Sequence, residues 1–246
     1  MARSYLHRRI GTALLLIAAY FAIQTIIVIA HEFAHSTSAW LLGYTATPFT
    51  VVWGNPITIQ GWDEGVPYDL LFPGSGHPAE AVIGGLPLLL HVVLLAISLR
   101  ALMTSLVRTR PVPFFGFYLL AVMNLAELVA YIIMRPFIPT GDTGRFNEGL
   151  NISPWPLFVA GNIVILFSLW LLARRIGPSI GSLTDGSRLE HRAITWFAGF
   201  IMFLWSSGIR MMVLYPDSQW KTGLIGIAAF VAWVAIDRRA SSSAPV

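Results

Sequence analysis

The chain alternates along its whole length between long apolar segments and shorter polar connections. Six segments have about 20 residues or more, which is the length a helix needs to cross the hydrocarbon core of a bilayer. They cover residues 10–43, 79–106, 112–137, 154–174, 193–214 and 219–236. This pattern predicts an all-α polytopic membrane protein with about six transmembrane helices.

The longest polar connection, residues 44–78, contains two runs rich in β-branched and aromatic residues around Gly54, Asn55 and Pro56: FTVVWGNPITIQGW. Such runs around a turn predict a small β-hairpin in the loop after the first helix. We expect one membrane domain over residues 1–246. It would comprise a core in 10–150, three additional helices in 154–236 and a flexible tail in 237–246.

Composition supports the membrane assignment and narrows the chemistry. Hydrophobic residues make up 56% of the chain and charged residues 11%, against about 25% charged residues in soluble domains. The net charge is +4, but the basic residues lie at the ends of apolar segments, so they indicate topology and not nucleic-acid binding. The chain has no cysteine, so any bound metal must be held by His, Asp or Glu.

The distribution of charge predicts the orientation of the helices. If the N-terminus is cytoplasmic, the inner connections carry most of the arginines: Arg3, Arg8, Arg9, Arg108, Arg110, Arg174, Arg175, Arg188, Arg192, Arg238 and Arg239. The outer connections are then acidic, with Asp63, Glu64, Asp69, Asp142, Glu148 and Asp217 against Arg145 and Lys221. The positive-inside rule therefore places both termini in the cytoplasm, and we expect the cell (plasma) membrane.

The first apolar segment ends in a motif that membrane helices rarely carry. Residues 31–35 read His-Glu-Phe-Ala-His, which matches H-E-x-x-H. Side chains four residues apart share one face of a helix, so His31 and His35 can reach one ion. Glu32 points beside that ion, where it can act as a general base towards an activated water. Zinc is the expected metal, because it accepts imidazole and carboxylate ligands and leaves a position open.

A catalytic metal needs a third protein ligand, and two carboxylates compete for that role. Asp142 follows Pro136 and Pro139, which stop the third long helix, and lies beside glycines that allow a sharp turn. We favour Asp142 as the ligand. Glu127, with Asn124 one turn away in the same helix, is the alternative ligand or a group that supports the ligands.

Other polar or small residues within apolar segments also receive predictions. His91 is expected to be a hydrogen-bonded packing residue. Gly84 and Gly85, beside Pro87, either kink the second helix or let another backbone approach it, and are possible substrate contacts. Arg145 could polarise a substrate carbonyl, although a headgroup contact fits it as well.

Taken together, these residues resemble the site-2 protease family of intramembrane zinc metalloproteases. The resemblance covers about residues 10–150: HEFAH, the hairpin segment, IGGLP at 83–87 and NLAELVAYIIMRPFIPTGD at 124–142. It implies His31, His35 and Asp142 as zinc ligands and Glu32 as the base. Asp142 precedes Thr143, whereas the family usually has glycine there. No segment is long enough for a PDZ-type insertion, so the resemblance is to compact, divergent members.

The sequence leads to one functional hypothesis and two alternatives. The first is a zinc-dependent intramembrane endopeptidase that hydrolyses peptide bonds in or near the transmembrane segments of membrane-protein substrates. The second is a metal-dependent membrane hydrolase with a non-peptide substrate. The third is a non-catalytic scaffold or transporter. Retention of Glu32 favours an enzyme over a degenerate relative, and the lipid bilayer is the expected surrounding in every case.

The orientation can be tested by cysteine labelling, since the chain has no native cysteine. We expect a membrane-impermeant maleimide to label a Ser75→Cys variant in intact cells. A Ser243→Cys variant should be labelled only after the membrane is permeabilised. The reverse pattern would invert the predicted topology.

Overall fold

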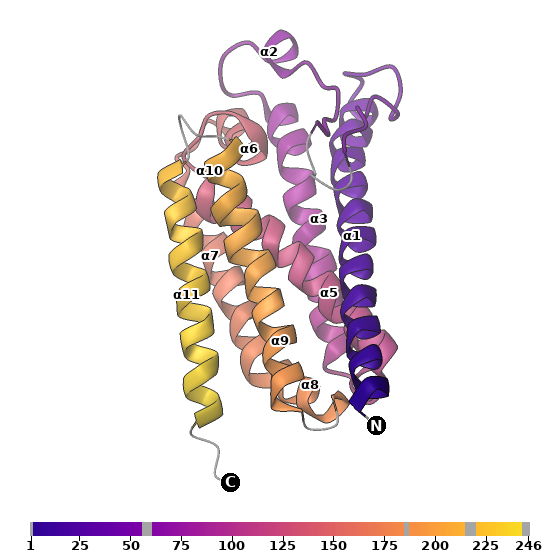
Figure 1. Cartoon of the computed structure of the whole chain (residues 1–246). Coiled ribbons are helices and arrows are strands. Elements are labelled where there is room, and N and C mark those ends of the chain that lie inside the picture. Colours follow the sequence, from indigo (N-terminus) through magenta and orange to yellow (C-terminus); the bar gives the residue numbers. More distant parts are fainter. Residues whose placement is uncertain (1, 56–60, 185–186, 215–219, 243–246) are drawn as a thin grey trace. The chain divides into compact units, whose positions relative to one another are not determined.

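The structure of the chain is a computed structural model that describes residues 2–55, 61–184, 187–214 and 220–242. The chain divides into two compact units, Met1–Pro73 and Gly74–Val246. Figure 1 shows both units as ribbons coloured along the sequence. Each unit is described by itself.

The described part of the chain contains six helical stretches that are long and apolar enough to cross a membrane. Their bounds are Ala13–Leu41, Pro78–Leu102, Pro111–Ile133, Trp155–Leu183, Arg188–Val213 and Trp220–Arg238. The prediction of an all-α chain with six potential spans is therefore confirmed, and the helices indicate a multi-pass membrane protein. A helix satisfies its own backbone hydrogen bonds, which is the requirement that an apolar solvent imposes.

The first unit consists of one long helix, α1 (Ala2–Leu41), and a loop that returns over its C-terminal end. Forty residues give a helix of about 60 Å. The helix ends at Leu41, and two residues later Gly43 has a left-handed φ of 82°. The Gly43 amide donates to the Trp40 carbonyl and the Tyr44 amide to the Ala39 carbonyl, a Schellman ending that satisfies the last carbonyls.

The predicted β-hairpin in this loop is not supported. Among the loop residues that the structure describes, Val52 and Asp63 form one isolated antiparallel bridge and no strand is present. Residues 56–60, which include Pro56 of the expected turn, lie outside the described residues. Nearby backbone groups bond to side chains instead of a ladder: the Thr50 hydroxyl donates to the Glu64 carbonyl, and the Gly65 amide donates to the Asp63 carboxylate.

The second unit contains the described helices that follow Pro73. Their order is α3 (Pro78–Leu102), α4 (Ser105–Arg108), α5 (Pro111–Leu128), η1 (Val129–Met134), α6 (Gly141–Leu150), α7 (Trp155–Leu171), η2 (Leu172–Ile176), α8 (Gly177–Leu183), α9 (Arg188–Gly199), η3 (Phe200–Ile209), α10 (Arg210–Leu214) and α11 (Trp220–Ser242). The short helix α2 (Tyr68–Leu71) belongs to the first unit. Helix α11 continues six residues past the predicted end of the last apolar segment, into the expected flexible tail.

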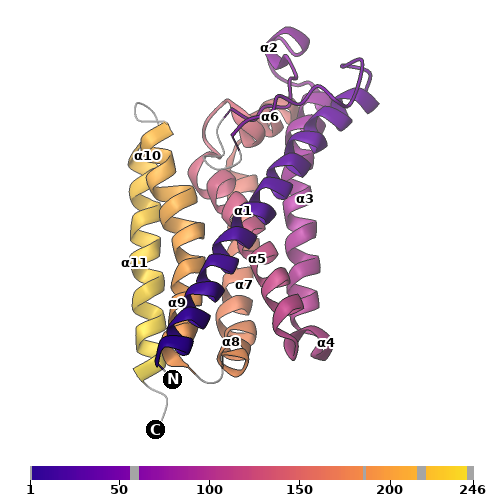
Figure 2. The same ribbon diagram turned by 45° about the vertical axis from the view of Figure 1, so that its right-hand side comes forward.

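Helix α5 lies at the centre of the second unit. In the most apolar part of the span Pro111–Ile133, 72% of the residues are buried, compared with 11% in the span Trp220–Arg238 of α11. Helix α5 packs against α3 on one side and against η3 on another, and α11 packs along η3 (Figure 2). The apolar surface of α5 is therefore shared with other helices, whereas that of α11 is available to lipid.

Helix α6 packs against α3 through glycines. A Cβ atom at Gly84 would lie 2.8 Å from the Cβ of Arg145 and 3.0 Å from the carbonyl oxygen of Asp142. A Cβ at Gly85 would lie 2.6 Å from the Phe146 ring, and one at Gly149 would meet the backbone of His77 and Ala81. Helix α3 runs unbroken past Pro87, so Gly84 and Gly85 admit a neighbouring helix of the same chain.

This close packing predicts that Gly84→Ala destabilises the second unit. Overpacking costs about 1–3 kcal/mol, because the added methyl group must push α6 away from α3. The matched control is Gly116→Ala in α5, where a Cβ meets nothing within 4 Å; this variant should keep the wild-type stability or gain up to about 1 kcal/mol, because Ala favours a helix more than Gly does. Unfolding in detergent measures both variants, and equal stabilities would contradict this packing.

Candidate metal centre

The HEFAH motif lies in the last third of α1, as the sequence predicts. His31, Glu32 and His35 are buried, with 5%, 8% and 2% of their surfaces exposed. The two imidazole rings have centroids 5.0 Å apart and planes at 74° to each other. One helix face therefore presents two imidazoles side by side, the arrangement that two ligands of one ion require.

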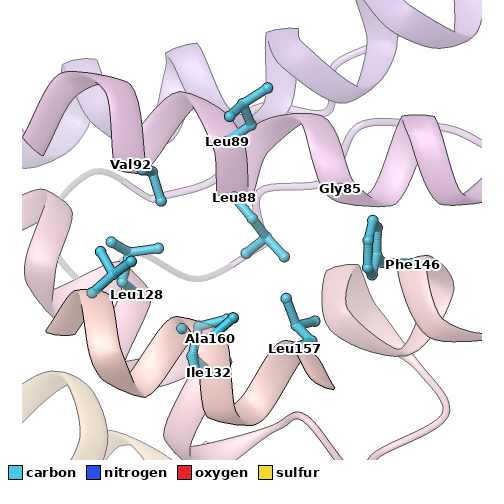
Figure 3. A pocket seen from close by; sticks show the side chains of 11 residues that line it. Gly85, Leu88, Leu89, Val92, Leu128, Ile132, Phe146, Leu157 and Ala160 are labelled. Atoms are coloured by element: carbon cyan, nitrogen blue, oxygen red, sulfur yellow. The ribbon is translucent and has the colours of Figure 1, made fainter. Parts of the chain in front are cut away.

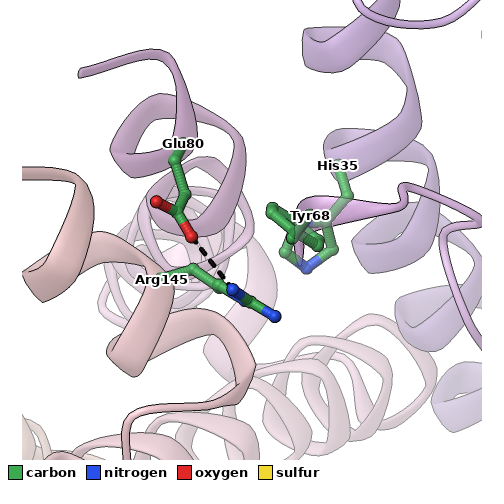
Figure 4. Close-up of polar contacts among 4 residues, drawn as sticks. All are labelled: His35, Tyr68, Glu80 and Arg145. Carbon is green, nitrogen blue, oxygen red and sulfur yellow. Dashed lines mark hydrogen bonds and ion pairs between the residues drawn. The ribbon is translucent and has the colours of Figure 1, made fainter. Parts of the chain in front are cut away.

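A residue that the sequence reasoning missed contacts this motif. The hydroxyl of Tyr68, in α2, lies 3.3 Å from Nδ1 of His35, and the Tyr68 side chain is buried (Figure 4). Tyr68 is 33 residues away along the chain, in a loop with no pattern that marks it. The loop contains several aromatic residues, so the sequence does not indicate which of them contacts His35.

Asp142 lies in the first turn of α6, in the second unit. The backbone turns into α6 at Gly141, which has a left-handed φ of 78°. Where η1 ends, backbone carbonyls lose their donors within the helix, and two α6 side chains replace those donors. The Thr143 hydroxyl donates to the Arg135 carbonyl at 3.0 Å. Asn147 Nδ2 donates to the Pro136 carbonyl at 3.2 Å. This break places the buried Asp142 carboxylate at a helix N-terminus, where the dipole favours negative charge.

Arg145, a predicted substrate contact, pairs with an acid of its own unit. Its Nη1 lies 3.2 Å from Oε1 of Glu80, which belongs to the first turn of α3 (Figure 4). The Glu80 side chain has no exposed surface, and Arg145 is 16% exposed. The space beside Gly84 and Gly85 is also filled by α6, so these three residues take part in the contact between α6 and α3.

Asn124 and His91 form a buried pair between α5 and α3. Asn124 Nδ2 donates to the Leu120 carbonyl, so its Oδ1 accepts from His91 Nδ1 at 2.9 Å. Both residues have no exposed surface. The expectation that His91 is a hydrogen-bonded packing residue is confirmed. Glu127, one turn after Asn124, is also buried in α5.

A groove in the second unit is lined by apolar residues of α3, α5, η1, α6 and α7 (Figure 3). Its volume is about 270 Å³, and Phe146 of α6 forms one wall. No ionisable side chain lines it. The groove suits an apolar group and offers no ligand to a metal.

The buried donor set fits a metal. His31, His35 and Asp142 supply two imidazoles and one carboxylate, residue types that could hold a metal ion. Catalytic zinc sites use three protein ligands of this kind. The Tyr68 hydroxyl lies 3.3 Å from Nδ1 of His35, which leaves the other ring nitrogen, Nε2, as the one suited to a metal.

Comparisons of the chain with protein-family models, with curated proteins and with solved structures find no match. The functional argument therefore depends on the residues of this chain.

The Glu80–Arg145 pair generates a stability prediction. Arg145→Gln should destabilise the protein by about 3–5 kcal/mol, because it leaves the Glu80 carboxylate buried without its cation. The double variant Glu80→Gln/Arg145→Gln should lose less than Arg145→Gln alone, since no charge is then stranded. A double-mutant cycle of unfolding in detergent measures the difference, and additive losses would show that the pair is not coupled.

Proposed function

We propose that this chain is a zinc-dependent intramembrane endopeptidase that cleaves peptide bonds in or near transmembrane segments of membrane proteins. The observation that carries the proposal is the burial of His31, Glu32 and His35 on one apolar, membrane-length helix. Polar side chains are costly in such a helix and are usually retained for a function.

In this proposal, His31 and His35 from the first unit and Asp142 from the second hold the ion. Asp142 is favoured over Glu127 because it stands on a break between helices, at the start of α6. Glu127 is part of the continuous helix α5. When bound, zinc supplies Lewis acidity, which polarises a carbonyl and makes a nearby water more acidic.

Glu32 is the proposed general base and acid. It follows His31 directly, so its carboxylate lies beside the two imidazoles and not on top of them. It would accept a proton from the attacking water and deliver that proton to the departing amine. Groups that transfer a proton in this way typically contribute 10²–10⁴ in rate.

The proposed substrate is a membrane-protein segment that has unwound locally. A transmembrane helix hides its peptide bonds within its own hydrogen-bond ladder, so a stretch must open before it can be cut. The resemblance to the site-2 proteases supports this substrate class, and the apolar character of both units agrees with a site within the membrane. The plasma membrane and cytoplasmic termini are part of the same proposal.

The test is zinc content and peptide cleavage of the detergent-purified protein. Wild type should hold about one zinc, and His35→Ala and Asp142→Ala should lose it. Glu32→Gln should keep zinc and lose at least about 10²-fold in cleavage rate, because it removes the base without removing a ligand. Glu127→Gln is the control and should keep both.

Three outcomes would change the proposal. If Glu127→Gln loses zinc and Asp142→Ala keeps it, the third ligand is Glu127. If the variants behave as expected towards zinc but no peptide is cut, a metal-dependent hydrolase of a non-peptide substrate replaces the protease. If metal-loaded wild type holds no stoichiometric zinc, the enzyme proposal fails and a scaffold or transporter takes its place.

A further inference from the structure

Loop 44–73 is attached to the HEFAH helix at neighbouring residues. The Tyr68 hydroxyl lies 3.3 Å from His35 Nδ1, and the Ser36 hydroxyl donates to the Pro48 carbonyl at 2.7 Å. His35 and Ser36 are adjacent in α1, while Pro48 and Tyr68 come from opposite ends of the loop. Both ends of the loop therefore bond to the helix at the second histidine of the motif.

We propose that Tyr68 is a positioning residue that fixes the His35 imidazole through Nδ1 and so couples docking of residues 61–73 of the loop to zinc binding. This inference rests on the proposed function, because it takes His35 as a zinc ligand. It adds that the loop is part of the metal centre.

The chemistry of imidazole gives Tyr68 this role. A neutral histidine that binds a metal through Nε2 carries its proton on Nδ1, and that N–H needs an acceptor. The Tyr68 oxygen can accept it. When the Tyr68 oxygen accepts from Nδ1–H, the electron pair on Nε2 is free for a metal, and the bond holds the ring against rotation. Partners of this kind typically change metal affinity by 10–100-fold.

The position of Tyr68 is in turn set by the loop. Its ring lies 6.2 Å from the Phe72 ring, and Phe72 packs edge-on against Tyr44 at 4.8 Å. Tyr44 lies three residues after Leu41, the last residue of α1, and its amide bonds to the Ala39 carbonyl. Ring contacts among Tyr44, Tyr68 and Phe72 therefore connect the two ends of the loop.

Coupling between two events is reciprocal: if loop docking strengthens zinc binding, zinc binding must stabilise the docked loop by the same factor. A residue that only packed the loop would affect the stability of the loop and leave zinc affinity unchanged. The two roles can thus be separated by measuring both quantities.

The first measurement is zinc affinity of the full-length protein in detergent, by competition with a chromophoric chelator. Tyr68→Phe keeps the ring and removes the hydroxyl, and we expect a 10–100-fold weaker affinity. Tyr44→Phe is the matched control, because it removes a hydroxyl from another of the three contacting rings, and its affinity should stay within twofold of wild type.

The second measurement is amide hydrogen exchange in residues 66–72, with and without zinc. In wild type and in Tyr44→Phe, zinc should slow this exchange. In zinc-saturated Tyr68→Phe, zinc should slow the exchange less than it does in wild type. The loss of protection should equal the factor by which this variant loses zinc affinity.

The inference is overturned if Tyr68→Phe binds zinc with wild-type affinity, or if zinc still protects residues 66–72 of this variant as strongly as in wild type. The protease proposal survives that result as long as wild type binds zinc and cleaves peptide. Weakened zinc binding in Tyr68→Phe together with no peptide cleavage by wild type would support the inference and reject the protease. Wild type without zinc would reject both.

Discussion

Each polar side chain that this chain takes into its apolar helices needs a partner, because a bilayer provides no water to solvate it. This constraint accounts for the polar contacts of both units. His35 meets Tyr68, His91 meets Asn124, and Glu80 meets Arg145. Each pair joins two segments that are far apart in sequence, so each polar group also fixes how two segments pack.

The break before α6 shows the same constraint acting on the backbone. Pro136 and Pro139 end the helical run, and a broken helix leaves carbonyls without intrahelical donors. Thr143 and Asn147 return from α6 to bind two of these carbonyls. Helix α6 can lie this close to α3 because glycines stand at the contact, and the Asp142 carboxylate is carried on the element that these contacts hold in place.

The first unit combines a regular helix, α1, with a loop that has little regular secondary structure among its described residues. The HEFAH motif lies on a continuous helix, whose ladder fixes the spacing of the two imidazoles. Tyr68 comes from a loop with one isolated β-bridge among its described residues, held by side-chain bonds and aromatic contacts. Such a loop opens at a lower free energy than a packed helix, which is why a ligand at its contact point can shift its stability.

The sequence by itself determined the six membrane-length helices and the HEFAH face, because both follow from local periodicity and length. It also determined that His91 would be a packing residue, since a lone imidazole among Leu and Val must find a bond. The predicted hairpin is not supported by the described residues, because β propensity does not reveal that Thr50 and Asp63 side chains would bind backbone groups of the loop. Only the tertiary structure decided that Glu80 would pair with Arg145, that Gly84 and Gly85 would receive α6, and that Tyr68 would reach His35. These contacts join residues separated by 33 to 65 positions, and no local pattern encodes which distant partner satisfies a buried polar group.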